Sequence, residues 1–141
     1  MLTELTLTED QVQQMIVHAY NSLPYEACGL LEGKAGRVQA VYAGINADNS
    51  PVSYRMDPQE QLRSMHAIEL AGRELLGIFH SHTHGPPVPS ATDHAQAYYP
   101  DAVYIIMARD PNGTWKMQGY NLHEDCPQEV ILTIEKIHAD C

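Results

Sequence analysis

Apolar residues recur at intervals of three and four between Thr8 and Leu23, which is the period of one face of an α-helix. Thr8 and Gln11 stand three positions apart at the start of this stretch and match a capping box, in which each side chain bonds the other residue's backbone amide. Pro24 follows the last apolar position, and a helix does not readily continue through proline. The pattern predicts an amphipathic helix that begins at Thr8 and ends near Pro24.

Shorter apolar stretches have the length or the alternation of β-strands. They cover residues 27–31, 38–45, 75–79, 102–107 and 114–120. The first two are expected to pair, and the turn sequence Asp110-Pro111-Asn112-Gly113 predicts a hairpin between the last two. Residues 130–137 also alternate and fit either a strand or a terminal helix.

Asp57, Pro58 and Glu60 place a cap, a proline and an acid in the order that helix starts prefer, so a helix is predicted from Asp57 to about Ala71. A shorter helix is expected to begin near Ser90, after a proline-rich loop. Helices that alternate with strands, together with a hairpin, predict an α/β fold with a mixed sheet. We expect one domain over residues 1–141, built as a three-layer α-β-α sandwich.

Composition and charge narrow the classes of function. Hydrophobic residues make up 44% of the chain and charged residues 18%, which is typical of a folded globular domain. A formal charge of -10 repels phosphate backbones and anionic lipid, so neither nucleic acid nor a membrane is an expected partner. The three cysteines, Cys28, Cys126 and Cys141, form no Cys-x-x-Cys pair, which favours a reducing cytoplasm.

Histidines are concentrated at the end of the strand predicted over 75–79. His80 and His82 are two positions apart, so their side chains point to the same face of a strand. Asp93, in the first turn of the following helix, is placed to complete a set of two imidazoles and one carboxylate. Such a set suits zinc and leaves a fourth position for water. His84 and His94 remain alternative ligands.

A hydrolytic zinc site also needs a base and a donor for the oxyanion. Glu26, just ahead of the strand that begins near Ala27, is the candidate base, and Glu32 at the far end of that strand is the reserve. The hydroxyl of Ser90 is the candidate oxyanion donor. Ser90 and Asp93 also spell a helix cap that requires no chemistry, and the two interpretations overlap.

The spacing His80-x-His82-x7-Ser90-x2-Asp93, with the upstream Glu26, resembles the JAMM (MPN-plus) metalloproteases of the compact stand-alone prokaryotic type. The resemblance extends from about Glu26 to Met107. It implies zinc ligation by the two histidines and Asp93, general base work by Glu26, and oxyanion support by Ser90. It also implies a fold like that of the cytidine deaminases.

That family cleaves peptide or isopeptide bonds after the C-terminal glycines of ubiquitin-like proteins, and compact bacterial members act on small sulfur-carrier proteins. The resemblance therefore implies a zinc peptidase whose substrate is such a carrier tail. The sequence departs from the commonest family pattern at Thr83, where many members have proline, and His84 adds a further histidine.

Other functions stay open at this point. Some relatives on the same fold have lost their ligands and serve as binding scaffolds, although every functional position is filled here. A deaminase-like zinc hydrolase would require His-x-Glu and Pro-Cys-x-x-Cys elements that the chain lacks. Cys28 could be a thiol nucleophile, but its place in an apolar strand favours a buried, unreactive side chain.

Overall fold

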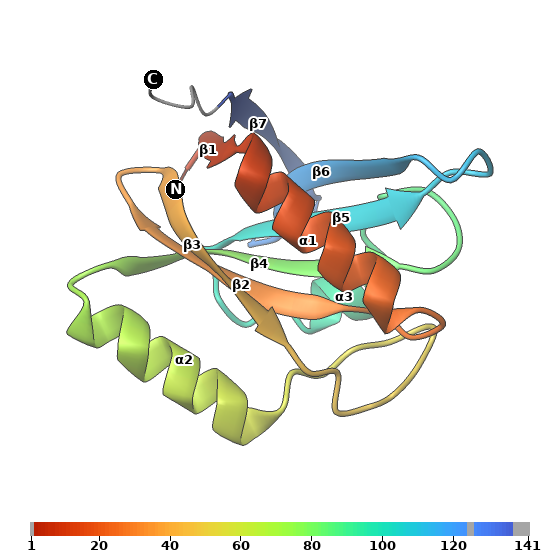
Figure 1. Ribbon diagram of the computed structural model, residues 1–141, viewed down its shortest axis with the longest axis horizontal. Coiled ribbons are helices and arrows are strands. Elements are labelled where there is room, and N and C mark those ends of the chain that lie inside the picture. Colours follow the sequence, from red (N-terminus) through yellow and green to blue (C-terminus); the bar gives the residue numbers. More distant parts are fainter. Residues whose placement is uncertain (1, 124–125, 137–141) are drawn as a thin grey trace.

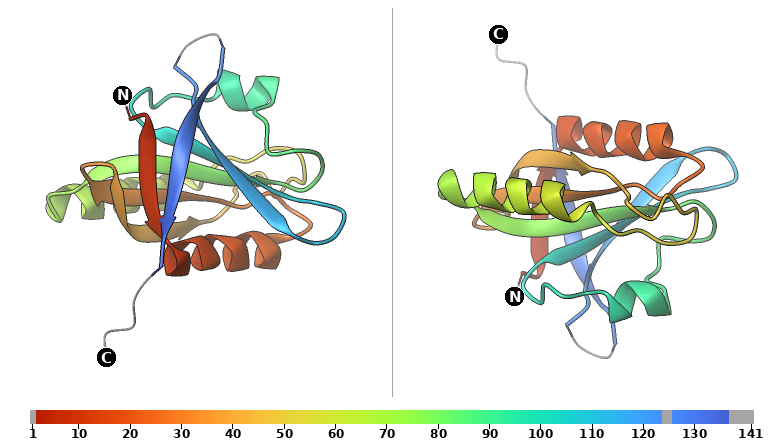
Figure 2. Two further views of the ribbon diagram at one scale, coloured as in Figure 1. Left: turned by 90° about the horizontal axis from the view of Figure 1, so that it is seen from above. Right: turned by 90° about the horizontal axis from the view of Figure 1, so that it is seen from below.

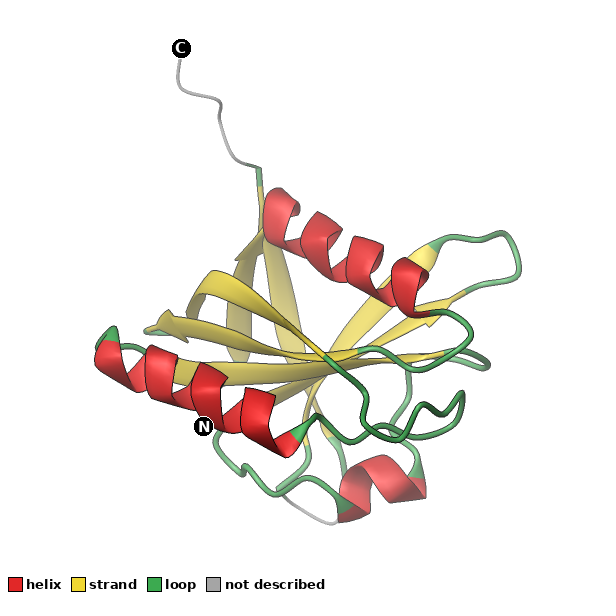
Figure 3. Cartoon of the chain, turned by 60° about the horizontal axis from the view of Figure 1, so that its bottom comes forward, coloured by secondary structure: helices red, strands yellow, loops and turns green. Residues whose placement is uncertain are grey.

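The computed structural model describes residues 2–123 and 126–136. Ile137, the last residue of the predicted terminal strand or helix, and Cys141 lie outside these ranges. The helices are α1 (Glu9–Ser22), α2 (Pro58–Leu70) and α3 (Ala91–Ala95), as Figure 3 shows. The strands are β1 (Glu4–Thr8), β2 (Cys28–Lys34), β3 (Arg37–Gly44), β4 (Glu74–His82), β5 (Val103–Arg109), β6 (Trp115–Asn121) and β7 (Gln128–Glu135).

The predicted start of the first helix is confirmed. The Thr8 hydroxyl accepts a hydrogen bond from the amide of Gln11 at 3.1 Å, and the Gln11 side chain accepts one from the Thr8 amide at 2.9 Å. Helix α2 begins at Pro58 as expected, but the Asp57 side chain makes no capping hydrogen bond. Its start therefore rests on the fixed φ angle of Pro58 rather than on a side-chain cap.

The strands form a mixed sheet in the order β1-β3-β2-β4-β5-β6-β7, which closes because β1 also pairs with β7. The β2–β3 and β5–β6 pairs are antiparallel hairpins, as predicted, whereas β4 and β5 run parallel. Residues 128–135 form a strand rather than a terminal helix. The predicted mixed α/β class is confirmed, and the three-layer sandwich and the likeness to cytidine deaminases stay predictions.

Strand β1 was missed by the sequence analysis, although the period of its residues is that of a strand. Leu5 and Leu7 are fully buried, and more polar residues alternate with them. The stretch is only five residues long and adjoins a strong helix signal at Thr8, so its alternation was too short to stand out.

Two hydrophobic clusters lie on opposite faces of the sheet. One contains Met15 and Ala19 of α1 together with Ile105 of β5, and the other contains Tyr104 and Ile106 of the same strand. Figure 2 shows α1 and α3 on opposite sides of the sheet. Because neighbouring β5 residues belong to different clusters, the centre of the sheet is buried on both faces, and it forms a rigid platform for side chains at its edge.

The register between β2 and β4 places the site. These strands are antiparallel, with Cys28 opposite His80 and Gly29 opposite Phe79. The Phe79 ring lies across Gly29, where an added Cβ would come within 2.3 Å of a ring atom. Glycine at position 29 therefore lets β2 approach β4 closely, and this brings the segment before β2 to the histidine end of β4.

Candidate metal centre

His80 and His82 occupy the C-terminal end of β4 and point to one face of the sheet, as the alternation predicted. His80 is fully buried, and His82 is partly exposed at the mouth of the site. Their Nε2 atoms are 3.2 Å apart. A strand end therefore presents two imidazole nitrogens to the same point in space.

Asp93 meets both histidines from the first turn of α3. Its Oδ1 atom is 3.0 Å from His80 Nε2, and its Oδ2 atom is 2.9 Å from His82 Nε2. Ligands about 2.0–2.1 Å from a tetrahedral zinc ion are roughly 3.3 Å from one another, which is close to these separations. Two imidazoles and a carboxylate at this spacing fit zinc in both donor type and position.

Ser90 holds Asp93 at this point through a complete capping box. The Ser90 hydroxyl accepts a hydrogen bond from the Asp93 amide at 3.0 Å, and the Ser90 amide donates to Asp93 Oδ2 at 2.9 Å. The predicted cap is therefore present. Ser90 is solvent-exposed, and because its hydroxyl oxygen accepts in the cap, the hydroxyl proton is left to donate elsewhere. The oxyanion role of Ser90 stays a prediction.

The surroundings of the two histidines differ. His82 Nδ1 lies 3.2 Å from the Pro86 carbonyl oxygen, an acceptor that fixes the ring with Nε2 facing Asp93. The His80 ring stacks on Tyr54, with centroids 4.4 Å apart and an angle of 20° between the planes. His80 Nδ1 is buried and has no hydrogen-bond partner within residues 2–123 and 126–136. Pro86 and Tyr54 were both missed by the sequence analysis, because a backbone acceptor and a stacking ring leave no spacing pattern.

The charges at the site favour a cation. Burial alone would raise the pKa of Asp93, but its hydrogen bonds to His80 and His82 hold that pKa well below the usual range. Burial lowers the pKa of His80, against the opposing effect of Asp93. For the less buried His82, burial is outweighed by Asp93, and its pKa is raised. The carboxylate is therefore negative and attracts positive charge to the point between the three side chains.

Glu26 lies in the segment just before β2 and is 5% exposed. Burial raises the pKa of its carboxyl from 4.5 to about 7, while His82 lowers it and Asp93 raises it further. A carboxyl that titrates near neutrality can both accept and return a proton. This is the property that a general base and acid requires.

Ser81, between the two histidines, anchors the Glu26 segment to β4. Its side chain points to the opposite face and accepts a hydrogen bond from the Ala27 amide at 2.8 Å, while the Ser81 amide donates to the Ala27 carbonyl at 3.0 Å. The Asn46 side chain also donates to the Glu26 carbonyl at 3.0 Å. The predicted ligands and base therefore come together through Ser81, a residue to which the sequence analysis gave no role.

The reserve candidate, Glu32, lies at the other end of β2 and not at this site. Its Oε1 atom accepts a hydrogen bond from Arg73 at 2.6 Å. Cys28 is buried, and burial raises the pKa of its thiol to about 12, so it is a thiol rather than a reactive thiolate near neutral pH. Both observations leave Glu26 as the candidate base.

Thr83, where the chain departs from the common family pattern, has a structural role. Its hydroxyl donates to the Pro51 carbonyl at 2.6 Å and ties the end of β4 to the loop between β3 and α2. His84 is exposed and does not belong to the group of convergent ligands. The site therefore uses two of the clustered histidines.

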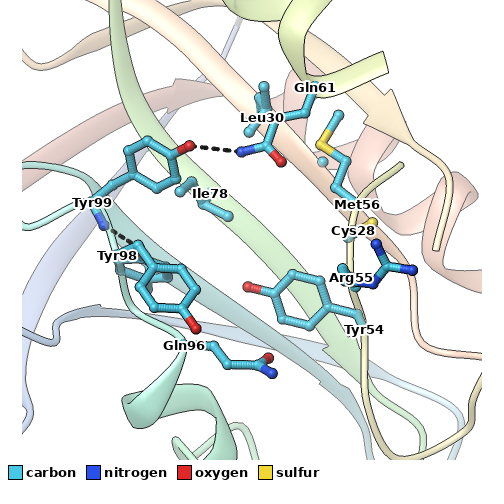
Figure 4. Close-up of a pocket in the computed structure, with 12 residues that line it drawn as sticks. Cys28, Leu30, Tyr54, Arg55, Met56, Gln61, Ile78, Gln96, Tyr98 and Tyr99 are labelled. Carbon is cyan, nitrogen blue, oxygen red and sulfur yellow. Dashed lines mark hydrogen bonds between the residues drawn. The ribbon is translucent and has the colours of Figure 1, made fainter. Parts of the chain in front are cut away.

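A cavity of about 170 Å³ lies beyond Tyr54, on the His80 side of the site. Figure 4 shows the rings of Tyr54, Tyr98 and Tyr99 around it, with the Gln61 side chain bonded to the Tyr99 hydroxyl at 2.9 Å. This aromatic pocket (Tyr54, Tyr98, Tyr99, Gln61 and their neighbours) adjoins the site through Tyr54, whose ring stacks on His80.

Comparison with known proteins places this geometry in context. Residues 8–118 match the family described as prokaryotic homologs of the JAB domain. A CysO-cysteine peptidase of Mycobacterium tuberculosis is 40% identical over 111 residues, which cover 77% of this chain and 76% of that protein. A desampylase of Haloferax volcanii is 37% identical over 115 residues, covering 77% and 83%.

Solved structures agree in fold. A protein from Desulfitobacterium hafniense superposes with a TM-score of 0.84 at 34% identity, covering 96% of this chain and 95% of that one. A JAB1/MPN domain protein from Archaeoglobus fulgidus superposes with a TM-score of 0.61 at 20% identity, covering 93% and 99%.

Proposed function

Because this chain belongs to the prokaryotic JAB family, we propose that it is a zinc-dependent hydrolase that cleaves a peptide or isopeptide bond at the C-terminus of a ubiquitin-like or sulfur-carrier protein. One observation carries the proposal. Nitrogen atoms of His80 and His82 and the carboxylate of Asp93 converge on one point, beside a buried Glu26 whose pKa is raised to about 7.

His80, His82 and Asp93 would hold the zinc ion. When bound, zinc would acidify a water molecule and polarise the scissile carbonyl. Glu26 would accept the proton that the attacking water gives up and then deliver it to the leaving amine. The Ser90 hydroxyl would donate a hydrogen bond to the oxygen that becomes negative in the transition state. Each role is assigned to a side chain that the fold already brings to this end of β4.

The names of the relatives support the substrate class. The Mycobacterium relative is a peptidase for a CysO-cysteine conjugate, the Haloferax relative is a desampylase, and a Thermus thermophilus relative, 33% identical over 124 residues, is described as a probable protease that cleaves TtuB-protein conjugates. We infer that this chain also acts on a carrier protein through its C-terminal tail.

We also propose a fold type and a location in the cell for this protein. The fold would be a three-layer α-β-α sandwich of cytidine-deaminase type. The location would be a reducing cytoplasm, with which the free thiols of Cys28 and Cys126 agree. Within the residues described, no helix is both long and apolar enough to cross a membrane.

The direct experiment is cleavage of a small carrier protein that ends in Gly-Gly and bears a C-terminal extension, followed by mass measurement. We expect zinc-loaded protein to release the extension after the second glycine, and the Glu26→Gln variant to leave the substrate intact. Tight binding without any cleavage would instead favour the scaffold alternative. A Glu26→Gln variant as active as the natural protein would refute the proposal.

A further inference from the structure

Glu26 is the candidate base, yet the sheet does not hold its backbone. Pairing between β2 and β4 starts at Cys28, opposite His80, so neither the amide nor the carbonyl of Glu26 belongs to that ladder. Glu26 is nevertheless 5% exposed, and buried backbone groups need hydrogen-bond partners. The β3–α2 loop (residues 45–57) supplies them. Figure 1 shows this loop in yellow, between the end of β3 and the start of α2.

The β3–α2 loop bonds both backbone groups of Glu26. The Glu26 amide donates to the Ser50 carbonyl at 2.9 Å, and the Glu26 carbonyl accepts from Asn46 Nδ2 at 3.0 Å. Ser81 bonds the following residue, Ala27, rather than Glu26 itself. The direction in which the Glu26 carboxyl leaves the main chain therefore depends on this loop. Of the two bonds, the one from Asn46 is made by a side chain, so a substitution can remove it.

Asn46 also closes the loop on itself. Its Nδ2 donates to the Ser53 carbonyl at 2.9 Å, and its Oδ1 accepts hydrogen bonds from the amides of Asp48 at 3.0 Å and Arg55 at 3.1 Å. An asparagine amide has two donor hydrogens and two acceptor lone pairs, and with the bond to Glu26 all four are engaged. Asn46 is 8% exposed, so little water competes for these bonds. One buried side chain therefore sets the position of the loop relative to Glu26.

The same network reaches the other side of the site through Tyr54. Ser53 and Arg55, whose backbones Asn46 bonds, are the two neighbours of Tyr54 in the chain. The Tyr54 ring stacks on His80, with centroids 4.4 Å apart. Asn46 thus ties the segment of the candidate base to the segment that packs on a candidate metal ligand. The placement of the base relative to the ligands is therefore sensitive to this single amide.

We propose that Asn46 is a positioning residue for the reaction, which keeps the Glu26 carboxyl at the metal centre by bonding the Glu26 backbone to the β3–α2 loop. This inference rests on the proposed function, because Asn46 acts through the base that the proposed function assigns. An uncharged amide suits the task, since it bonds the backbone without placing a second charge beside the carboxyl. A displacement of about 1 Å at a reaction centre can lower the rate by about 10²-fold. The loss of the Asn46 bonds should therefore be visible in kcat.

The first test is a double-mutant cycle on cleavage of a carrier that ends in Gly-Gly and bears a C-terminal extension. Asn46→Ala should lower kcat of the zinc-loaded protein by about 10²-fold with zinc content unchanged. In the Glu26→Gln protein, whose slow residual cleavage is followed at high protein concentration, the same change should lower kcat by less than about 2-fold, because the carboxyl that Asn46 positions is already absent. Equal factors in the two backgrounds would show a general structural role and overturn the proposal.

Two further variants separate the bond to Glu26 from other effects. Asp48→Ala breaks the 3.3 Å ion pair with Arg55 in the same loop and leaves the bonds to Glu26, so it should retain kcat within about 2-fold. Asn46→Asp, when ionised, keeps the acceptor that closes the loop and loses the donors, so it should fold and still lose kcat by about 10²-fold. Full activity of Asn46→Asp, or an equal loss in Asp48→Ala, would contradict the role of Asn46.

Amide hydrogen exchange separates this inference from the proposed function, because it requires no cleavage. The bond to Ser50 should protect the Glu26 amide in the natural protein, and Asn46→Ala should speed its exchange by about 10-fold relative to Asp48→Ala. Amides of β5, at the centre of the sheet, should not change. Unchanged protection of the Glu26 amide would overturn the role of Asn46 even if carriers are cleaved. Lost protection in a protein that cleaves no carrier would instead count against the hydrolase and keep Asn46 as the residue that holds Glu26.

Discussion

Two buried glutamates lie near opposite ends of β2, Glu32 within the strand and Glu26 just before it, in contrasting environments. Glu32, at one end, is 2% exposed and has Arg73 as a partner at 2.6 Å. Glu26, just before the other end, is similarly buried, but no described arginine or lysine pairs with it. The charged groups that act on its carboxyl are those of His82 and Asp93. The charge of the paired acid is compensated by its partner, whereas the unpaired acid has a pKa near neutrality that chemistry can use.

The contrast shows why burial alone does not identify a catalytic residue. A buried carboxylate is tolerated when a cation neutralises it, and it is then a structural element. A buried carboxylate without that partner costs stability and is informative only where a reaction centre adjoins it. At the Glu26 end, His80, His82 and Asp93 converge and could hold a metal ion, which would provide such a centre.

The largest expected effect comes from replacing the Glu26 carboxyl by an amide. Glu26→Gln should lower kcat by about 10²–10⁴-fold, because proton transfer by a positioned carboxyl contributes that much, while zinc content stays unchanged. Glu32→Gln is the matched control and should retain kcat within about 2-fold. Steady-state cleavage with metal analysis of both variants measures this, and equal losses in the two would erase the distinction between the acids.

A smaller effect is expected from the two capping boxes. Ser90→Ala and Thr8→Ala each remove a helix cap, so each should lower the free energy of unfolding by about 1 kcal/mol. If the Ser90 hydroxyl also supports the oxyanion, Ser90→Ala alone should lower kcat by about 10²-fold. Urea unfolding and cleavage rates of the pair decide the point. Should both variants keep full activity, Ser90 is a cap and nothing more.

Arg73→Ala should destabilise the protein without changing the chemistry. It leaves the Glu32 carboxylate buried and unpaired, which we expect to lower the free energy of unfolding by about 2 kcal/mol, since Arg73 is itself partly exposed. Urea unfolding gives the stability, and kcat measured well below the melting temperature should match that of the natural protein. A large fall in kcat would mean that the Glu32 end communicates with the site.

A pH dependence of stability is also expected in chelator-treated protein. The pKa of Glu26 is about 7 in the folded protein and near 4.3 when unfolded, so only the folded state keeps the proton between these values. The contribution of this proton to the free energy of unfolding is complete below about pH 4 and is lost as the pH rises through 7. The limiting slope is about 1.4 kcal/mol per pH unit. Glu26→Gln should gain stability relative to the natural protein over this interval in urea titrations. If the free energy of unfolding of the two proteins changed in parallel with pH, the Glu26 carboxyl would not be held neutral in the folded state.

Much of this arrangement could be predicted from sequence because it depends on short-range patterns. The capping box at Thr8, the alternation that puts His80 and His82 on one face, and the place of Asp93 one turn into α3 are local features. The periods of strand and helix place these residues, and the resemblance to the JAMM metalloproteases assigned them a role as ligands. The candidate ligands could thus be named before their geometry was known.

What could not be predicted depends on contacts between distant segments. Ser81 bonds Ala27 across 54 positions, and Tyr54 reaches the His80 ring from a loop. Closure of the sheet depends on β1, a five-residue strand that pairs with the far end of the chain. The partner of Glu32 is 41 residues away, so the local pattern left Glu32 as a reserve candidate and only the family resemblance favoured Glu26.

The central claim is that one metal ion is shared by His80, His82 and Asp93. The most direct measurement is the zinc content of the purified protein and of its Asp93→Ala variant, by mass spectrometry under conditions that preserve folding. The account predicts one zinc per chain in the natural protein and none in the variant, with both folded by circular dichroism. Zinc bound equally by the two, or by neither after incubation with excess metal, would contradict it.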